Sequence, residues 1–143
     1  MQRSASLTVT TALLALALAL ALALALLPAG CGVGSGGPES KSSETTDTYL
    51  RSLASGDTTK ACAQLTAEAK SKLGESCAAA MQTIATRVGP DRLGEAADRG
   101  ASISVDDSTG SATLEGLNDA RIGLVDSGSG WLIESGYTLD GGS

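Results

Sequence analysis

Carboxylates and tyrosine hydroxyls are the groups of this chain that could take part in acid–base chemistry. The 143-residue sequence contains no histidine, the side chain that most often moves protons at neutral pH. The candidate bases are Asp57, Asp98 and Glu115, and Tyr49 and Tyr137 could donate to a ligand oxygen. We favour a structural explanation for each: a helix N-cap for Asp57, solvent for the other acids, and the apolar core with a hydroxyl at its rim for tyrosine. We therefore assign no catalytic residue.

The remaining motifs predict neither a metal site nor a cofactor site. Structural zinc usually needs four Cys or His ligands, which three cysteines without histidine do not provide. The spacing of Cys62 and Cys77 is not that of a redox-active Cys-x-x-Cys pair. The Ser-Gly-Ser-Gly segment at 127–130 lacks the strand-to-helix context of a nucleophile elbow, and no glycine-rich segment matches a phosphate-binding loop. Trp131 is expected to pack in the last strand rather than to serve as a ligand platform.

The N-terminus predicts where the protein is found. Arg3 precedes an Ala-Leu run over residues 12–27, a pattern typical of an export signal. The run ends in Pro28-Ala29-Gly30-Cys31, and a Cys directly after Ala-Gly resembles the lipobox of bacterial lipoproteins. The resemblance implies that residues 1–30 are a signal peptide that is removed. It also implies that the Cys31 thiol carries a diacylglyceryl group with fatty acyl chains such as palmitate.

Two alternatives to lipidation remain open. Lipoboxes usually hold Leu three positions before the Cys, where this chain has Pro28. The segment could instead be an uncleaved membrane anchor, although the Ala-Leu run is shorter than the ~20 residues that usually span the hydrocarbon. It could also be an ordinary secretory signal, but no small-x-small triplet stands where the apolar run ends.

Cysteine parity agrees with lipidation. If Cys31 carries lipid, Cys62 and Cys77 remain as a pair, and outside the cytosol such a pair is expected to oxidise. A disulfide that closes a loop of about 15 residues contributes ~3 kcal/mol in the chain-entropy model. We therefore predict a structural disulfide between these two residues.

The charge of the chain limits its partners. It has 10 basic and 16 acidic residues, which give a net charge of −6. Without residues 1–30 the net charge is −7, because Arg3 is the one charged side chain of that segment. Such acidity disfavours nucleic acid and electrostatic docking to anionic lipid, both of which require Lys/Arg clusters. The predicted membrane contact is therefore the diacylglyceryl Cys31, since two acyl chains anchor a protein stably. The expected location is the extracytoplasmic face of the cell membrane, in the cell envelope.

The rest of the chain predicts one α+β domain over residues 44–140. Residues 31–43 are Gly/Ser-rich and are expected to form a flexible tether, and residues 141–143 a tail. Helical periodicity and capping residues are followed, after residue 100, by short alternating segments between Gly/Asp/Ser turns. Helices first and an antiparallel meander afterwards indicate an α+β fold. The first expected helix is 48–54, and Asp57 is expected to cap a second helix that contains Ala61, Cys62 and Leu65. Thr66 is expected to cap a short continuation through Leu73, Ser76 a helix from Cys77 to about Val88, and a weak turn follows at 91–99. The expected strands are 102–105, 112–114, 120–125 and 131–134.

One pattern of residues resembles the nuclear-transport-factor-2-like (SnoaL-like) superfamily, and in particular small actinobacterial envelope proteins of that type. The matching positions are Tyr49, Leu50, Leu53, Gly56, Asp57, Ala61, Cys62, Leu65, Cys77 and the strand Gly130-Trp131-Leu132-Ile133. The resemblance implies a cone in which a curved antiparallel sheet wraps around the helices, often with a cavity at its open end. It implies no single activity, because this scaffold hosts isomerases, dehydratases, binding modules and assembly domains.

These observations favour a non-catalytic, lipid-anchored envelope domain that binds a small molecule or a partner protein. The alternatives are a histidine-free isomerase or dehydratase that uses carboxylates in the cone, and a structural role without a pocket. The cone interior separates them: ionisable side chains in a roomy cavity would favour chemistry, and an interior filled by aliphatic side chains would favour binding by the outer surface.

Overall fold

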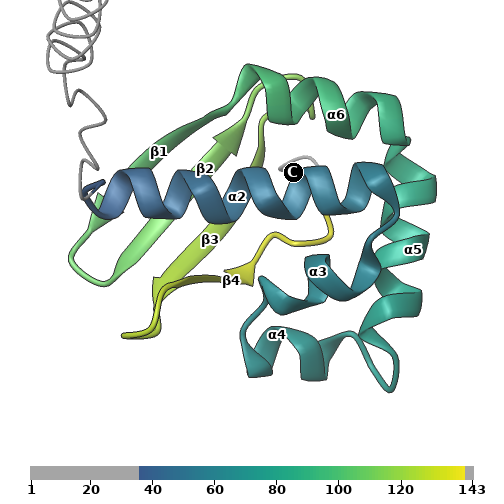
Figure 1. Cartoon of the computed structure of the whole chain (residues 1–143), viewed down its shortest axis with the longest axis horizontal. Helices are drawn as coiled ribbons and strands as arrows, with labels where there is room; N and C mark the ends of the chain where they lie inside the picture. Colours follow the sequence, from purple (N-terminus) through teal and green to yellow (C-terminus); the bar gives the residue numbers. More distant parts are fainter. Residues whose placement is uncertain (1–35, 141–143) are drawn as a thin grey trace, which may run out of the picture. The chain divides into compact units, whose positions relative to one another are not determined.

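The structure, a computed structural model, describes residues 36–140 (Figure 1). The predicted signal peptide, Cys31 and the tail at 141–143 lie outside the described residues. The helices of the described part are α2 (Pro38–Ser55), α3 (Thr58–Ala63), α4 (Ala67–Lys72), α5 (Cys77–Val88) and α6 (Pro90–Arg99). The strands that follow them are β1 (Ala101–Asp106), β2 (Thr109–Leu114), β3 (Ala120–Asp126) and β4 (Trp131–Ser135).

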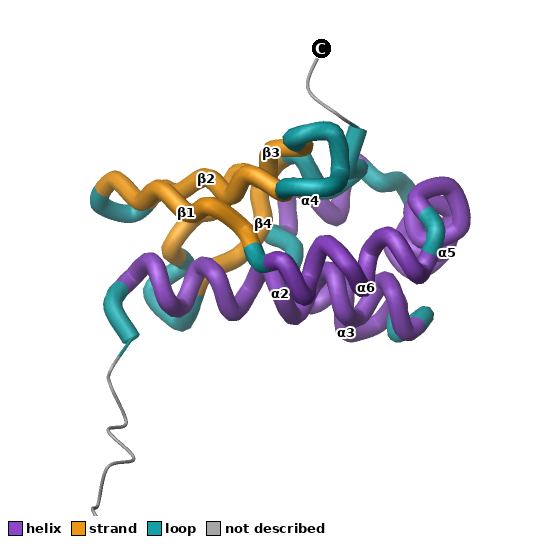
Figure 2. The backbone as a smooth tube through the Cα atoms, turned by 90° about the horizontal axis from the view of Figure 1, so that it is seen from above, coloured by secondary structure: helices purple, strands orange, loops and turns teal. Residues whose placement is uncertain are grey.

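The α+β prediction is confirmed. The four strands form one antiparallel meander in the order β1-β2-β3-β4, with Ile103 opposite Ala112 and Ala112 opposite Ile122. Alternate residues of each strand face the helices, which gives one buried and one solvated sheet face. Figure 2 shows the sheet as one layer and α2 and α6 as a second layer against it.

Helix α2 begins earlier than predicted, so the expected tether of residues 31–43 is wrong from Pro38 onward. Proline suits the first turn of a helix because its missing N–H would have no intrahelical partner there. The Ser42 hydroxyl donates to the Glu39 carbonyl, and the Thr46 hydroxyl donates to the Ser42 carbonyl. These bonds satisfy the small polar side chains within the helix and allow them to be buried. The folded domain therefore starts near Gly36 rather than at residue 44.

The predicted helix caps are present at three helix starts. Asp57 accepts from the Lys60 amide of α3, Thr66 from the Ala69 amide of α4, and Ser76 from the Ala79 amide of α5. Each side-chain oxygen satisfies an amide that has no partner inside the helix. The predicted bounds of α5 are those of the structure, whereas the weak turn at 91–99 is a full helix, α6.

The core lies between α2 and the inner face of the sheet. Its largest fully buried apolar side chains come from both halves of the chain: Tyr49, Leu50, Leu53, Leu65, Met81, Leu93, Leu114, Ile122 and Ile133. Their burial joins the helical half to the meander in one hydrophobic cluster.

A C-terminal segment, residues 136–140, crosses one end of this core, and we call it the C-terminal strap. It leaves the sheet at Gly136, whose φ is +70°, and a Cβ there would lie 1.8 Å from the Arg121 carbonyl oxygen. Leu139 of the strap is buried, and Arg87 of α5 donates to the Thr138 carbonyl and pairs with Asp140. The strap is thus fixed to both the sheet and α5.

Alanine at position 136 should destabilise the fold by roughly 3 kcal/mol or more, because it combines an unfavourable positive φ with a backbone collision. Gly128 is the matched control, since it has φ +81° and open space around a Cβ. Gly128→Ala should cost only the ~1–2 kcal/mol of the left-handed conformation. Urea unfolding of both variants measures the difference. Equal losses would show that the strap does not pass Arg121 as described.

Candidate functional site

The interior of the domain, where the resemblance implies a cavity, is filled. The buried polar residues of the described chain are Ser42, Thr45, Thr46 and Ser52, and no buried side-chain nitrogen or oxygen there lacks a hydrogen-bond partner. No Asp, Glu, Lys or Arg of the described residues is buried. Tyr49 is therefore the one titratable group of the described core.

The three predicted acids are not brought together. Asp57 is exposed and caps α3, as expected. Asp98 pairs with Arg51 at 3.1 Å on the surface of α6, with 73% of its side chain exposed. Glu115 is exposed between β2 and β3. Two carboxylates that share a proton or flank a substrate must lie close together, and this arrangement offers no such pair.

Tyr49 is placed differently from the sequence expectation. Its hydroxyl is not at the rim of the core: the residue is 0% exposed, and the hydroxyl donates to the Tyr137 carbonyl of the C-terminal strap and contacts Met81 Sδ at 3.5 Å. Burial, followed by the nearby charge of Tyr137 when ionised, raises the pKa of Tyr49 well above its ordinary value of 10.0. The strap carbonyl is 88 residues away in the chain, so no local sequence signal indicated it.

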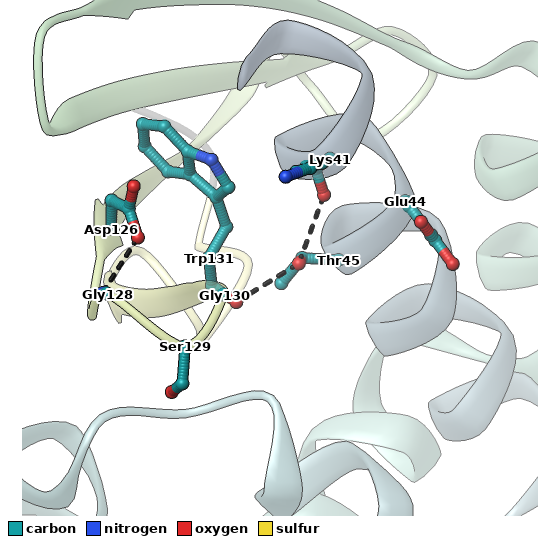
Figure 3. Close-up of a pocket in the computed structure, with 8 residues that line it drawn as sticks. All are labelled: Lys41, Glu44, Thr45, Asp126, Gly128, Ser129, Gly130 and Trp131. Carbon is teal, nitrogen blue, oxygen red and sulfur yellow. Dashed lines mark hydrogen bonds between the residues drawn. The ribbon is translucent and has the colours of Figure 1, made fainter. Parts of the chain in front are cut away.

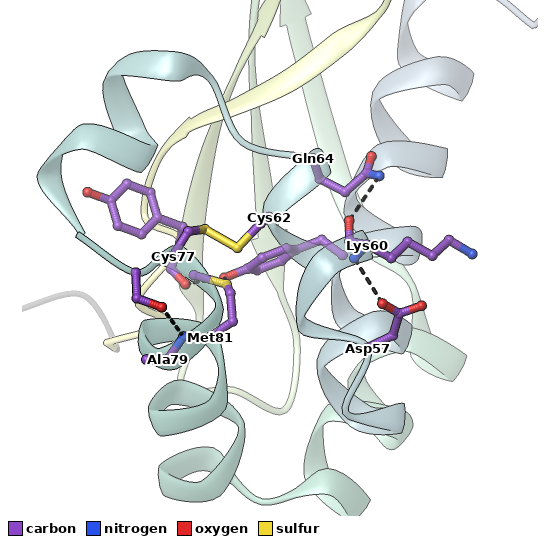
Figure 4. The surroundings of a disulfide bond; sticks show 10 residues. Asp57, Lys60, Cys62, Gln64, Cys77, Ala79 and Met81 are labelled. Atoms are coloured by element: carbon purple, nitrogen blue, oxygen red, sulfur yellow. Dashed lines mark hydrogen bonds between the residues drawn. A yellow bond between two sulfur atoms is a disulfide. The ribbon is translucent and has the colours of Figure 1, made fainter. Parts of the chain in front are cut away.

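The predicted disulfide is confirmed. Cys62 of α3 and Cys77 of α5 are bonded, with 6.1 Å between their Cα atoms (Figure 4). Both residues are half-buried against the core, next to Met81. The bond connects two helices that are separated along the chain by α4 and a turn.

One candidate site is a surface cleft. It lies between the N-terminal half of α2 and the loop that connects β3 to β4, and its volume is about 410 Å³ (Figure 3). This volume falls within the range of roughly 300–1,000 Å³ that is typical of small-molecule sites. We call it the Trp131 cleft, and it is lined by Lys41, Glu44, Thr45, Asp126, Gly128, Ser129, Gly130 and Trp131.

Trp131 forms the floor of this cleft. It is 5% exposed, and its ring packs so closely on β2 that a Cβ at Gly110 would lie 3.3 Å from the ring. The packing role predicted for Trp131 is therefore present. The Thr45 hydroxyl contacts both the Lys41 carbonyl at 3.2 Å and the Trp131 carbonyl at 3.1 Å, which ties α2 to β4. In Figure 3 the nitrogen-bearing edge of the indole points toward α2, on the side of Lys41.

The loop beside Trp131 is held by its own hydrogen bonds. Asp126 Oδ1 accepts from the Gly128 amide at 2.8 Å, and the Ser127 hydroxyl donates to the Gly130 carbonyl at 2.7 Å. The Ser127 amide donates to the same carbonyl at 2.9 Å. The wall of the cleft is thus formed before any ligand binds. The sequence indicated the turn, but not that α2 lies opposite it.

Two further observations concern metal sites and membrane spans. Residues 36–140 include no group of three or more Cys, Asp or Glu side chains placed to hold a metal ion. Among the helices of residues 36–140, none is long and apolar enough to span a bilayer.

Comparisons with protein-family models, with curated proteins and with solved structures found no match.

Reducing the disulfide should lower the free energy of unfolding by ~3 kcal/mol, because a 15-residue loop is then released in the unfolded chain. Urea unfolding with and without reductant measures this effect. The Cys62→Ala/Cys77→Ala variant is the control and should not respond to reductant. A wild-type unfolding midpoint that is unchanged by reductant would contradict a stabilising bond.

Tyr49→Phe should cost ~1–2 kcal/mol at neutral pH, since the Tyr137 carbonyl loses its partner. The pKa of Tyr49 is higher in the folded chain than in the unfolded one, so its contribution is complete below pH 10 and is lost as the pH rises above that value. Wild-type stability should therefore fall more steeply above pH 10 than that of the variant, by up to ~1.4 kcal/mol per pH unit.

Tyr137→Phe is the matched control for this test, because it keeps the carbonyl and removes only a hydroxyl without a hydrogen bond to the described residues. Its stability should stay within ~0.5 kcal/mol of wild type. Parallel pH profiles of wild type and Tyr49→Phe would contradict a buried, hydrogen-bonded Tyr49.

Proposed function

We propose that this protein is a lipid-anchored, extracytoplasmic domain without catalytic activity that binds a ligand or partner through its outer surface, at the Trp131 cleft. The observation that carries the proposal is the filled interior: apolar side chains occupy the space between α2 and the sheet, and no charged side chain of the described part lies there. The Trp131 cleft is a concave surface feature with a preformed wall and is available to a ligand.

The anchor is supported by cysteine usage. Of the three cysteines, Cys62 and Cys77 are consumed by the disulfide, which leaves Cys31 as the remaining thiol. That thiol stands directly after Pro28-Ala29-Gly30 at the end of the apolar leader. A lipid on Cys31 accounts for the odd cysteine count of an exported chain.

The resemblance to nuclear-transport-factor-2-like proteins remains part of the proposal. Helices that precede an antiparallel meander, with the Gly56-Asp57 joint after the first described helix, support it. The filled interior separates this chain from members that work through an open cone. The alternative of a carboxylate-only isomerase or dehydratase has weak support, because Asp57, Asp98 and Glu115 are exposed and dispersed.

The early start of α2 shortens the link between the proposed lipid and the domain. Only residues 32–37 lie between Cys31 and Pro38, and a chain of that length spans at most ~25 Å even when fully extended. Lys41, Glu44 and Thr45 of the Trp131 cleft lie in the first turns of α2. A lipidated Cys31 would therefore keep the cleft close to the membrane surface.

Intact-mass measurement of the protein from its native membranes tests the anchor. The wild-type chain should lack the mass of residues 1–30 and carry the mass of the acyl groups. Cys31→Ser should lose the acyl mass, whereas the matched control Cys62→Ser/Cys77→Ser should retain it. A wild-type chain that is full-length and unacylated would contradict the proposal and favour an uncleaved anchor.

A further inference from the structure

From the polar groups that the Trp131 cleft presents, we infer that its ligand is a neutral polyhydroxylated compound, a saccharide. The inference rests on the proposed function, because it names the ligand class of the same site. Three groups from three positions carry it: the Lys41 ammonium of α2, the indole N–H of Trp131 at the start of β4, and the Asp126 carboxylate at the end of β3.

These three groups are free to bind a ligand. Lys41 is exposed, and no described residue forms an ion pair with its ammonium group. The indole N–H has no acceptor among the described residues, and Asp126 uses only Oδ1 internally, for the Gly128 amide. The other polar side chains of the lining point away from the indole in Figure 3: the Glu44 carboxylate and the Ser129 hydroxyl. The cleft thus offers two donors and one strong acceptor.

The two charged groups, Lys41 and Asp126, lie on different sides of the indole. Figure 3 shows Lys41 on the side of the indole nitrogen and Asp126 on the opposite side of the ring. A ligand that reaches all three must accept hydrogen bonds at one end and donate one at the other. Hydroxyl groups do both, because each has one donor hydrogen and two acceptor lone pairs. A compound that carries several hydroxyls satisfies this requirement without any charge of its own.

Charge argues against an anionic ligand. Lys41 is the single basic residue of the lining, against Glu44 and Asp126. Asp106 at the end of β1 and Asp107 in the turn that follows add further negative charge to this end of the sheet (Figure 1). A phosphate or a polyanion would bind Lys41 in a field that repels it.

The indole orientation argues against a cationic ligand. Cations bind to the negative face of an aromatic ring, and here Trp131 is buried and its ring packs on Gly110. What the indole offers is its N–H edge, which is the positive part of the ring and stands on the side of Lys41. A cation would meet two positive groups at that end. A neutral ligand with hydroxyls has a partner for each group and meets no repulsion.

Saccharide hydroxyls near a membrane have two sources, the headgroup of a glycolipid and a free or wall-bound glycan. Both present the same chemistry to the cleft. The experiment therefore includes free methyl α-mannoside, maltotriose and chitotriose, and separately vesicles that contain digalactosyl diacylglycerol.

Trp131 is the only tryptophan of the chain, so its fluorescence reports on this cleft alone. The full chain is reconstituted in phosphatidylcholine vesicles and titrated with each saccharide probe. Spermidine and inorganic phosphate serve as the cationic and anionic comparisons. At least one saccharide probe, free or as the glycolipid, should give a saturable change in Trp131 emission, and the two ionic probes should give none.

Two variants assign the signal to the named groups. Asp126→Asn keeps an acceptor for the Gly128 amide but removes the carboxylate charge, and Lys41→Met keeps the aliphatic stem but removes the ammonium. Each should raise the saccharide dissociation constant by ~10-fold, the effect of losing one charge-assisted hydrogen bond. The matched controls are Asp119→Asn, in the turn at the other end of β3, and Lys60→Met on α3, and both should bind as wild type.

The outcomes separate this inference from the proposed function. No saturable response to any saccharide, or equal affinities for the cleft variants and the controls, would overturn the saccharide assignment. A saturable response to spermidine or phosphate alone would also overturn it, yet would leave a binding function at the cleft. If no probe changes the Trp131 emission and the mass measurement finds an unacylated chain, both the saccharide assignment and the proposed function are wrong.

Discussion

The hydrogen bond from the buried Tyr49 hydroxyl to the Tyr137 carbonyl joins three parts of the domain that are far apart in the chain. It starts on α2, passes Met81 of α5, and ends on the C-terminal strap. The aromatic ring fills the space between the helices and the sheet, and the hydroxyl needs a partner because an unsatisfied buried donor is costly. The strap supplies that partner, and it is held in turn by Arg87 and by the burial of Leu139. The interior is closed at this end because this bond is made.

A domain of this size has few other means of stability. The chain has few aromatic residues and no phenylalanine. Much of its core consists of alanine, leucine and isoleucine side chains. Small side chains bury little area each, so covalent and polar links carry a larger share of the stability. The disulfide between α3 and α5 is one such link, and the Thr45 hydroxyl that reaches the Trp131 carbonyl is another. Together they hold the helices around a filled core rather than around a chamber.

Local signals in the sequence predicted most of the secondary structure. Asp57, Thr66 and Ser76 are residue types that predict helix caps, and each side chain accepts the expected hydrogen bond from a backbone amide. The strands follow from the alternation of polar and β-branched residues between Gly/Asp/Ser turns. The disulfide follows from parity and the expected compartment.

The errors share a physical cause, which is that long-range contacts override local composition. The first turns of α2 are rich in Ser and Thr and resemble a tether, yet Ser42 and Thr46 bond to carbonyls of their own helix and are buried under the rest of the fold. The Trp131 cleft could not be predicted, because it forms where α2 meets the β3–β4 loop, some 85 residues further along. The buried position of the Tyr49 hydroxyl likewise depends on a distant strap.

The proposed binding at the outer surface requires an interior without a chamber. A crystal structure of the protein under xenon pressure tests this claim most directly, because xenon enters dry apolar cavities in protein cores. We expect no xenon between α2 and the sheet. An ordered xenon atom beside Tyr49 would reveal an internal chamber and contradict the account.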